Sequence, residues 1–187
     1  MYETSDFRNG LKIEYDGIPY VIIEFQHVKP GKGNAFTRTR IKSLLDGRVL
    51  QPTFKSGEKV GKPDVEDKTM QYLYADGDSC TFMDTQNYEQ VNIPRVNIGD
   101  SVAFLKENMD VAVVFWNGRA ISVELPRSVN LKITECEPGV RGDTATNATK
   151  GATLETGAKI QVPLFIKEGE TVRIDTESGK YMERVNS

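Results

Sequence analysis

Five turn signals, spread along the whole chain, limit it to a fold built from β-hairpins. Short runs rich in Val, Ile, Tyr, Phe and Thr are broken by glycine dipeptides, namely Asp16-Gly17, Asp46-Gly47, Asp76-Gly77, Asn117-Gly118 and Ser178-Gly179. Asp-Gly and Asn-Gly suit type I′ hairpin turns, in which both central residues have a positive φ. The sequence therefore predicts an all-β chain of antiparallel hairpins that curl into small barrels.

Helix signals are few, and breaks in the pattern divide the chain. Ser101 to Asn108 carries apolar residues at helical spacing, which fits either one or two helical turns or an irregular connection. Structure-breaking residues cluster at Lys62-Pro63-Asp64 and at Leu125-Pro126-Arg127. These breaks predict three units, each small enough to need contacts with its neighbours. The predicted units are 1–64, 65–126 and 127–187.

Charge is distributed unevenly although the net charge is only −3. Residues 1–64 carry 11 basic and 8 acidic side chains, residues 65–126 carry 4 and 10, and residues 127–187 carry 9 and 9. The overall balance gives no indication of nucleic-acid binding, but the first unit is locally basic. The acidic middle unit repels RNA, which favours a basic protein partner or docking in one orientation.

The residues that most catalytic sites need are scarce. His27 is the single histidine, Cys80 and Cys136 lack CxxC spacing, and neither Gly-x-Ser-x-Gly nor Gly-x-Gly-x-x-Gly occurs. We therefore expect a binding protein that is no enzyme and uses no metal or cofactor. Without a secretory leader or an apolar run of about 18 residues, we also expect a cytoplasmic monomer with reduced thiols.

A glycine-flanked lysine is the most distinctive local feature. The segment Pro30-Gly31-Lys32-Gly33-Asn34-Ala35-Phe36 lies between the strand-like runs 18–28 and 35–41. Gly31 and Gly33 permit a positive φ and leave Lys32 as the long side chain at the tip of a hairpin. A phosphate-binding loop would need Ser or Thr after the lysine and a helix. By itself the segment also fits a plain turn with a solvated lysine.

Four segments together resemble bacterial elongation factor P. The longest is Lys150 to Ile166, KGATLETGAKIQVPLFI, which continues through Glu168-Gly169-Glu170 to Tyr181 and Arg184. The others are Val28 to Phe36, Met70 to Gly77, and Gly142-Asp143-Thr144. The resemblance covers the whole chain. It implies an N-terminal KOW- or SH3-like barrel and two OB-fold barrels, in an L-shaped arrangement that resembles tRNA.

The resemblance also implies a function. Members of this family bind the ribosome between the P and E sites, beside the peptidyl-tRNA, and stimulate peptide-bond formation at consecutive prolines. Lys32 would reach toward the peptidyl-transferase centre, and a lysine-modifying enzyme would be a further partner. β-Lysylation, an aminopentanol-type addition and an unmodified lysine remain open, whereas rhamnosylation applies where arginine replaces the lysine. No membrane partner is implied.

Other site residues follow from position in the family pattern. Lys29, Arg38, Arg40 and Lys42 surround the loop and are candidates for contacts with tRNA phosphates. Tyr181 and Arg184 match a C-terminal Tyr-x-x-Arg that the family associates with tRNA contact, and Gly142, Asp143 and Thr144 match the loop that it associates with the E-site codon. Solvated strand charge, half-buried sheet surface and turn geometry are the plainer explanations of these residues.

Two other functions remain open for this chain. A paralogous elongation factor P-like protein would share the fold, although the Pro-Gly-Lys-Gly loop favours the main factor. A general RNA-binding OB-fold module would have no role at stalled prolines, so Lys32 would matter little to it.

Overall fold

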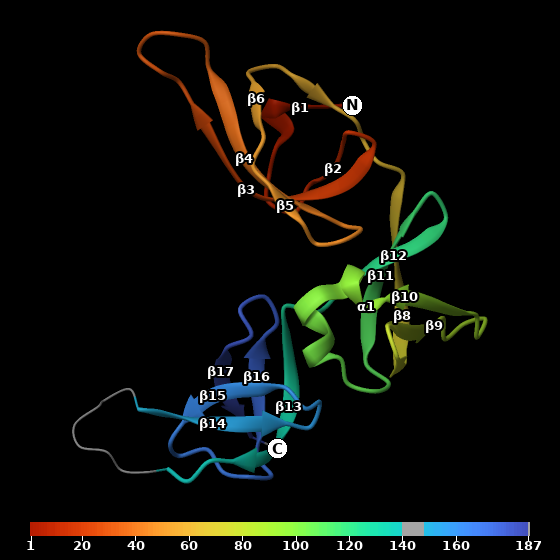
Figure 1. The fold of residues 1–187 in the computed structure, drawn as a ribbon, viewed down its shortest axis with the longest axis vertical. Helices are drawn as coiled ribbons and strands as arrows, with labels where there is room; N and C mark the ends of the chain where they lie inside the picture. The colour runs from red at the N-terminus through yellow and green to blue at the C-terminus, as the bar shows by residue number, and fades with distance from the viewer. Residues whose placement is uncertain (140–147, 187) are drawn as a thin grey trace.

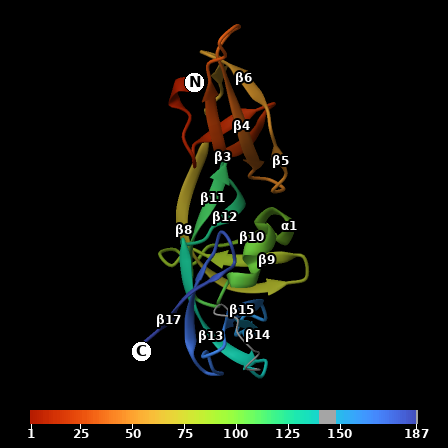
Figure 2. The same cartoon turned by 90° about the vertical axis from the view of Figure 1, so that its left-hand side faces the viewer.

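The computed structural model describes residues 1–139 and 148–186, and it consists of three antiparallel β-sheet units that follow one another along the chain. Figures 1 and 2 show the units in sequence order along the longest axis, with the N-terminus in the first and the C-terminus in the last. The third unit is displaced to one side of the line through the first two in Figure 1. The predicted all-β fold is confirmed.

The first unit is a curled sheet with a long hairpin. Its main sheet has the order β2-β3-β4-β5, β6 adds to β4, and β1 pairs with β7. The strands are β1 (Tyr2–Glu3), β2 (Lys12–Tyr15), β3 (Ile18–Val28), β4 (Phe36–Ser43), β5 (Val49–Leu50), β6 (Thr53–Lys55) and β7 (Lys59–Val60), with a short helix η1 (Thr4–Asp6). The core is formed by apolar residues that include Ile13, Tyr20, Ile22, Ile41 and Phe54.

The middle unit is a five-stranded sheet that closes on itself. Its order is β10-β9-β8-β11-β12, and the end strands β10 and β12 lie in contact, so the sheet forms a barrel. The strands are β8 (Val65–Asp76), β9 (Ser79–Met83), β10 (Gln90–Pro94), β11 (Asp110–Trp116) and β12 (Arg119–Glu124). Fully buried Cys80, Phe82, Ile93 and Val113 fill its centre.

The helical segment of the middle unit lies earlier than the sequence indicates. It comprises α1 (Arg95–Ile98) and η2 (Gly99–Phe104), and the backbone is already extended at Leu105. The helical half of the expectation for Ser101 to Asn108 is therefore correct only up to Phe104. Leu105 is buried in the core of the barrel, and Asn108 has φ of 67°, which places a turn where the helix was expected.

The third unit repeats this design. Its order is β15-β14-β13-β16-β17, with β15 and β17 in contact. The strands are β13 (Ser128–Cys136), β14 (Thr149–Leu154), β15 (Lys159–Pro163), β16 (Thr171–Asp175) and β17 (Tyr181–Val185). Its core includes Leu131, Ile133, Leu154, Val162 and Ile174. Within the described residues, no helix is long and apolar enough to span a membrane.

All five glycine dipeptides join neighbouring antiparallel strands, but their turns differ. Asp16-Gly17 and Asn117-Gly118 have a positive φ at both residues, as a type I′ turn requires. In Asp46-Gly47, Asp76-Gly77 and Ser178-Gly179, only the glycine has a positive φ. The prediction of hairpins is therefore confirmed at all five places, and the prediction of type I′ geometry is wrong at these three.

Candidate functional site

A long hairpin carries Lys32 away from the body of the first unit. β3 and β4 remain paired as far as Val28 and Phe36, so that residues 29–35 form the tip. Residues 29 to 34 are exposed, Lys32 among them. Figure 1 shows this hairpin projecting from the first sheet, at the end of the molecule that also holds the N-terminus. The side chain of Lys32 is therefore presented to solvent at the far end of an arm.

The two glycines beside Lys32 have different roles. Gly33 has φ of 111°, a conformation that residues with a side chain rarely adopt. Gly31 lies outside this region of φ, and a Cβ atom there would meet nothing within 4 Å. The positive φ that both glycines permit is thus adopted by Gly33 and not by Gly31. Gly33 therefore turns the backbone, whereas the conformation at Gly31 is open to residues with a side chain.

Side-chain contacts on both strands hold the arm together just below the tip. Thr37 on β4 is buried, and its hydroxyl oxygen lies 2.9 Å from Nδ1 of His27 on β3. Phe25 packs edge-on against the His27 ring, with 5.4 Å between the ring centroids. The backbone N–H of Ser56 donates to the carbonyl of Ala35 at 3.1 Å, which ties the tip to the segment after β6. These contacts therefore support the exposed tip from the strands that lead into it.

The structure brings the basic candidates of the first unit together. Buried and exposed residues alternate along β4, so Arg38, Arg40 and Lys42 all point to the outer side of the hairpin. Lys29 is exposed at the start of the tip. We call Lys29, Arg38, Arg40 and Lys42 the arm cations; they lie on the same hairpin as Lys32. Such a stripe of positive charge can bind phosphate groups by Coulomb attraction and hydrogen bonding.

Tyr181 and Arg184 form a second, separate group on β17. Tyr181 is half-buried and packs against the core of the third unit. Arg184 is exposed, and its Nη1 lies 3.3 Å from Oε1 of Glu170. Its guanidinium carbon lies 5.6 Å from the ring centroid of the exposed Phe165, which sequence reasoning did not single out. Figure 1 shows β17 in the third unit, far from the arm.

The candidates for the loop that reads the E-site codon, Gly142, Asp143 and Thr144, lie outside the described residues.

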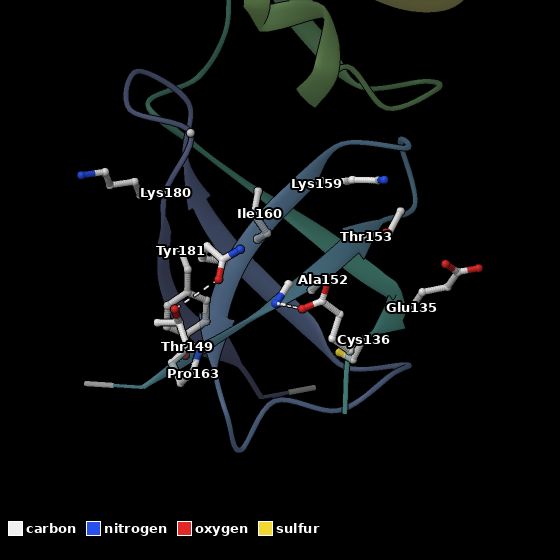
Figure 3. Close-up of a pocket in the computed structure, with 14 residues that line it drawn as sticks. Glu135, Cys136, Thr149, Ala152, Thr153, Lys159, Ile160, Pro163, Lys180 and Tyr181 are labelled. Carbon is white, nitrogen blue, oxygen red and sulfur yellow. Dashed lines mark hydrogen bonds between the residues drawn. The ribbon is translucent and has the colours of Figure 1, made fainter. Parts of the chain in front are cut away.

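Tyr181 also lines a shallow hollow of about 820 Å³ on the third unit, which the sequence did not reveal. Ala152 and Ile160 supply buried apolar surface there. Figure 3 shows Tyr181 beside Thr149, while Lys180 points outward. Because lysine and glutamate side chains both line the hollow, it has no strong charge preference.

In residues 1–139 and 148–186, no group of three or more His, Cys, Asp or Glu is placed to hold a metal ion.

Family models match all three units. The elongation factor P KOW-like domain matches residues 3–60, the elongation factor P OB domain matches residues 65–123, and the elongation factor P C-terminal domain matches residues 129–184. The predicted combination of a KOW-like unit with OB-fold units is therefore confirmed. A solved structure of eukaryotic translation initiation factor 5A from Methanococcus jannaschii has a similar fold, with a TM-score of 0.52 and 23% identity. It is matched over 67% of this chain and 90% of its own.

Relatives named elongation factor P match this chain over nearly its full length. Elongation factor P of Moorella thermoacetica is 54% identical over 184 residues, which cover 98% of this chain and 100% of that protein. Elongation factor P of Bdellovibrio bacteriovorus is 50% identical over 186 residues, which cover 100% of this chain and 99% of that protein. The lysine hairpin, the three β-sheet units and these matches agree: the chain belongs to the elongation factor P family of translation factors.

Proposed function

We propose that this protein binds the ribosome between the P and E sites and stimulates peptide-bond formation at consecutive prolines. The observation that carries the proposal is the exposed Lys32 at the tip of a projecting hairpin, in a chain of this family. The arm cations extend from the tip along β4 and supply positive charge that suits the phosphates of a peptidyl-tRNA. Tyr181 and Arg184 would contact the same tRNA from the third unit.

The contribution to the reaction would be positional. Proline restricts the backbone because its ring fixes φ, so a peptidyl-tRNA that ends in proline is difficult to place for attack. A cationic arm against the end of that tRNA would limit misplacement and reduce the entropy cost of reaching the reactive geometry. The ribosome would still make the bond. The protein would thus act as a binding partner, with no catalytic residue of its own.

The proposal includes the division and outline of the molecule. Units 1–64, 65–126 and 127–187 would form an L of the size of tRNA, which would let the arm and the third unit reach separate parts of one site. Each of the three main sheets lies within one of these ranges, which supports the division.

Replacing Lys32 tests the proposed function. In a reconstituted translation assay with a Pro-Pro-Pro reporter, Lys32→Ala should abolish most of the stimulation, because the tip loses its charge and reach. The melting temperature should stay within about 1 °C of the wild type, since exposed substitutions rarely change stability. Lys59→Ala, at an exposed position on β7, which pairs with β1 and not with the arm, serves as the matched control. Full stimulation by Lys32→Ala would leave the general RNA-binding module as the better explanation.

The same variant tests the proposed modification. Protein isolated from its native cells should show an intact mass above that of the unmodified chain, and Lys32→Ala should remove the excess. The size of the excess distinguishes a β-lysyl group from an aminopentanol-type addition. A mass equal to that of the unmodified wild-type chain would rule out modification and leave the unmodified lysine to act alone.

A further inference from the structure

The arm cations are not equivalent, and the difference begins with the faces of the hairpin. Phe36, Arg38 and Arg40 share the outer face of β4, since Thr37 and Thr39 between them are buried. Directly opposite on β3 stand Gln26, which pairs with Arg38, and Glu24, which pairs with Arg40. One arginine therefore faces a neutral amide, whereas the next one faces a carboxylate.

Arg38 is held by an aromatic ring. Its guanidinium carbon lies 5.4 Å from the centroid of the Phe36 ring, which is within range for a cation–π contact. Phe36 pairs with Val28 on one side and with Lys55 on the other, so the ring stands on a three-stranded part of the sheet. A guanidinium stacked on a ring keeps the N–H groups at its edge free to donate. No ion pair within the described part of the chain includes Arg38.

Arg40 is partly neutralised. Its Nη1 lies 3.3 Å from Oε2 of Glu24, and the two side chains are 49% and 65% exposed. An ion pair this exposed opens easily, so Arg40 can still turn toward another anion. The charge of Glu24 nevertheless stays on the same face, where it repels a phosphate. The two arginines therefore offer a phosphate unequal attraction.

We propose that Arg38, positioned by Phe36, is the main phosphate contact on the outer face of the arm, and that Glu24 weakens phosphate binding there. The proposal rests on the proposed function and specifies its partner chemistry as the phosphate backbone of the bound tRNA. Glu24 makes the face a poor general binder of RNA, so that binding depends on the other contacts of the correct site. Such a repulsive group trades affinity for specificity.

The test is the affinity of the full chain for ribosomes that carry a P-site tRNA, measured over a series of salt concentrations. Arg38→Ala should weaken binding about tenfold, the effect of losing one charged contact, and lower the salt dependence by about one counterion. Arg40→Ala should weaken it less than about threefold, since Glu24 already offsets that charge. Glu24→Gln should strengthen binding about twofold to fivefold, and its affinity for unrelated RNA should rise as well.

Two further variants test the role of the ring. Phe36→Leu keeps apolar bulk but removes the π face, and Arg38→Lys keeps the charge but cannot stack as a plane. Both should lose binding by an amount between wild type and Arg38→Ala. Wild-type affinity of both variants would overturn the role of Phe36. Equal losses in Arg38→Ala and Arg40→Ala, or no gain in Glu24→Gln, would overturn the ranking of the two arginines.

Lys32→Ala in the Pro-Pro-Pro assay separates this proposal from the proposed function. If Lys32→Ala loses stimulation while the arginine and Glu24 variants bind like the wild type, the proposal for the arm face fails and the proposed function stands. If the wild-type chain does not bind these ribosomes at any salt concentration, both fail. Melting curves of each variant should match the wild type, because every substituted side chain lies at least partly exposed on the surface of the sheet.

Discussion

Gly33 is the residue whose backbone conformation shapes the lysine tip. Its φ of 111° is strained for any side chain, by about 1–2 kcal/mol or more. We expect Gly33→Ala to shift the exposed tip to another conformation and leave the sheet intact. A strain of that size lowers the population of the present conformation about 5- to 30-fold. Stimulation on a Pro-Pro-Pro reporter should fall correspondingly, while the melting temperature stays near that of the wild type.

Gly31→Ala is the matched control at the other side of Lys32. Gly31 needs no left-handed φ, and an added Cβ would meet nothing within 4 Å. This variant should keep most of the stimulation and the same melting temperature. Equal losses in the two alanine variants would show that backbone conformation at Gly33 is unimportant. The sequence alone makes the two glycines look alike, because φ depends on how the tip closes in three dimensions.

The loop between β9 and β10 is held in place by the buried carboxylate of Asp84. Asp84 is 3% exposed, pairs with Lys68 and accepts the backbone N–H of Gln86 at 2.8 Å. The hydrogen bond from Lys68, followed by that from Gln86, lowers the pKa of Asp84 below its usual range. Because the carboxyl pKa is lower in the folded state, the ionised carboxylate stabilises the fold at pH values above the unfolded pKa of about 3.9. This stabilisation is lost as the pH falls through the folded pKa.

Asp84→Asn should therefore remove part of the acid sensitivity of this protein. We expect the melting temperature at pH 7 to drop by a few degrees, since the ion pair with Lys68 is lost. Below about pH 4 the difference from the wild type should shrink, because the Asp84 carboxyl then takes up a proton in the unfolded wild-type chain, and at still lower pH in the folded chain. Asp78→Asn, in the exposed turn after β8, is the control and should leave the profile unchanged. A parallel shift of the Asp84→Asn profile at every pH would contradict the role of the charge.

Turn residues predicted where the elements begin and end better than they predicted turn geometry. Each glycine dipeptide joins two strands as expected, and its glycine has a positive φ, a conformation that glycine adopts without steric cost. Asp46-Gly47 differs from a type I′ turn because it belongs to a longer loop with local side-chain bonds. Ser43 Oγ accepts the N–H of Leu45 at 3.1 Å, and the Asp46 carboxylate accepts the N–H of Arg48 at 3.0 Å. Such bonds offer the backbone an alternative to the tight turn.

The position of the helical segment also depends on contacts that the local sequence does not show. Residues 95–104 form the helical segment although Val96 is exposed and Gly99 interrupts it, so the apolar periodicity is weak. Asn97 compensates through the fold, since its side-chain amide donates to the carbonyl of Ile121 on β12 at 2.8 Å. A contact between residues 24 positions apart leaves no local pattern in the sequence. Tertiary contacts here override the local signal.

At the scale of the whole molecule, two joints connect the three units. At the first joint Leu44 packs with Val114 and Ile121 of the middle unit. At the second, Phe104 is buried in the core of the third unit. There the Thr156 hydroxyl also donates to the carbonyl of Ala103 at 2.6 Å. The small size of the units predicted such interfaces, but their residues could not be predicted, because these contacts join distant parts of the chain.

Lys12 is the charged centre of the first joint. Its Nζ lies 3.0 Å from Oδ1 of Asp67 and 3.0 Å from Oε1 of Glu124, and its side chain is 16% exposed. Partial burial disfavours the ammonium, but the hydrogen bonds and charges of the two carboxylates outweigh it and raise the pKa of Lys12. Because the lysine pKa is higher in the folded state, the ammonium stabilises the fold at pH values below the unfolded pKa of about 10.4. This stabilisation is lost as the pH rises through the folded pKa.

Lys12→Ala should loosen the first unit from the middle unit. Asp67 and Glu124 would then lose the cation they share; because both side chains are nearly half exposed, water screens their charges and the cost is about 1 kcal/mol or less. We expect calorimetry to show an earlier melting transition for the first unit, and small-angle X-ray scattering to show a broader range of overall lengths. Because the arm is part of the first unit and β17 part of the third, stimulation at prolines should fall although Lys32 is unchanged.

Removing the carboxylates as well provides the control. Lys12→Met combined with Asp67→Asn and Glu124→Gln replaces the ion pairs with neutral groups of similar size and should recover most of the lost stability. Its stability should also lack the alkaline decline expected of the wild type above about pH 10. If Lys12→Ala melts and scatters like the wild type, the apolar contacts of Leu44 hold the joint without help from Lys12. Loss of stimulation without any loosening would instead assign Lys12 a direct contact on the ribosome.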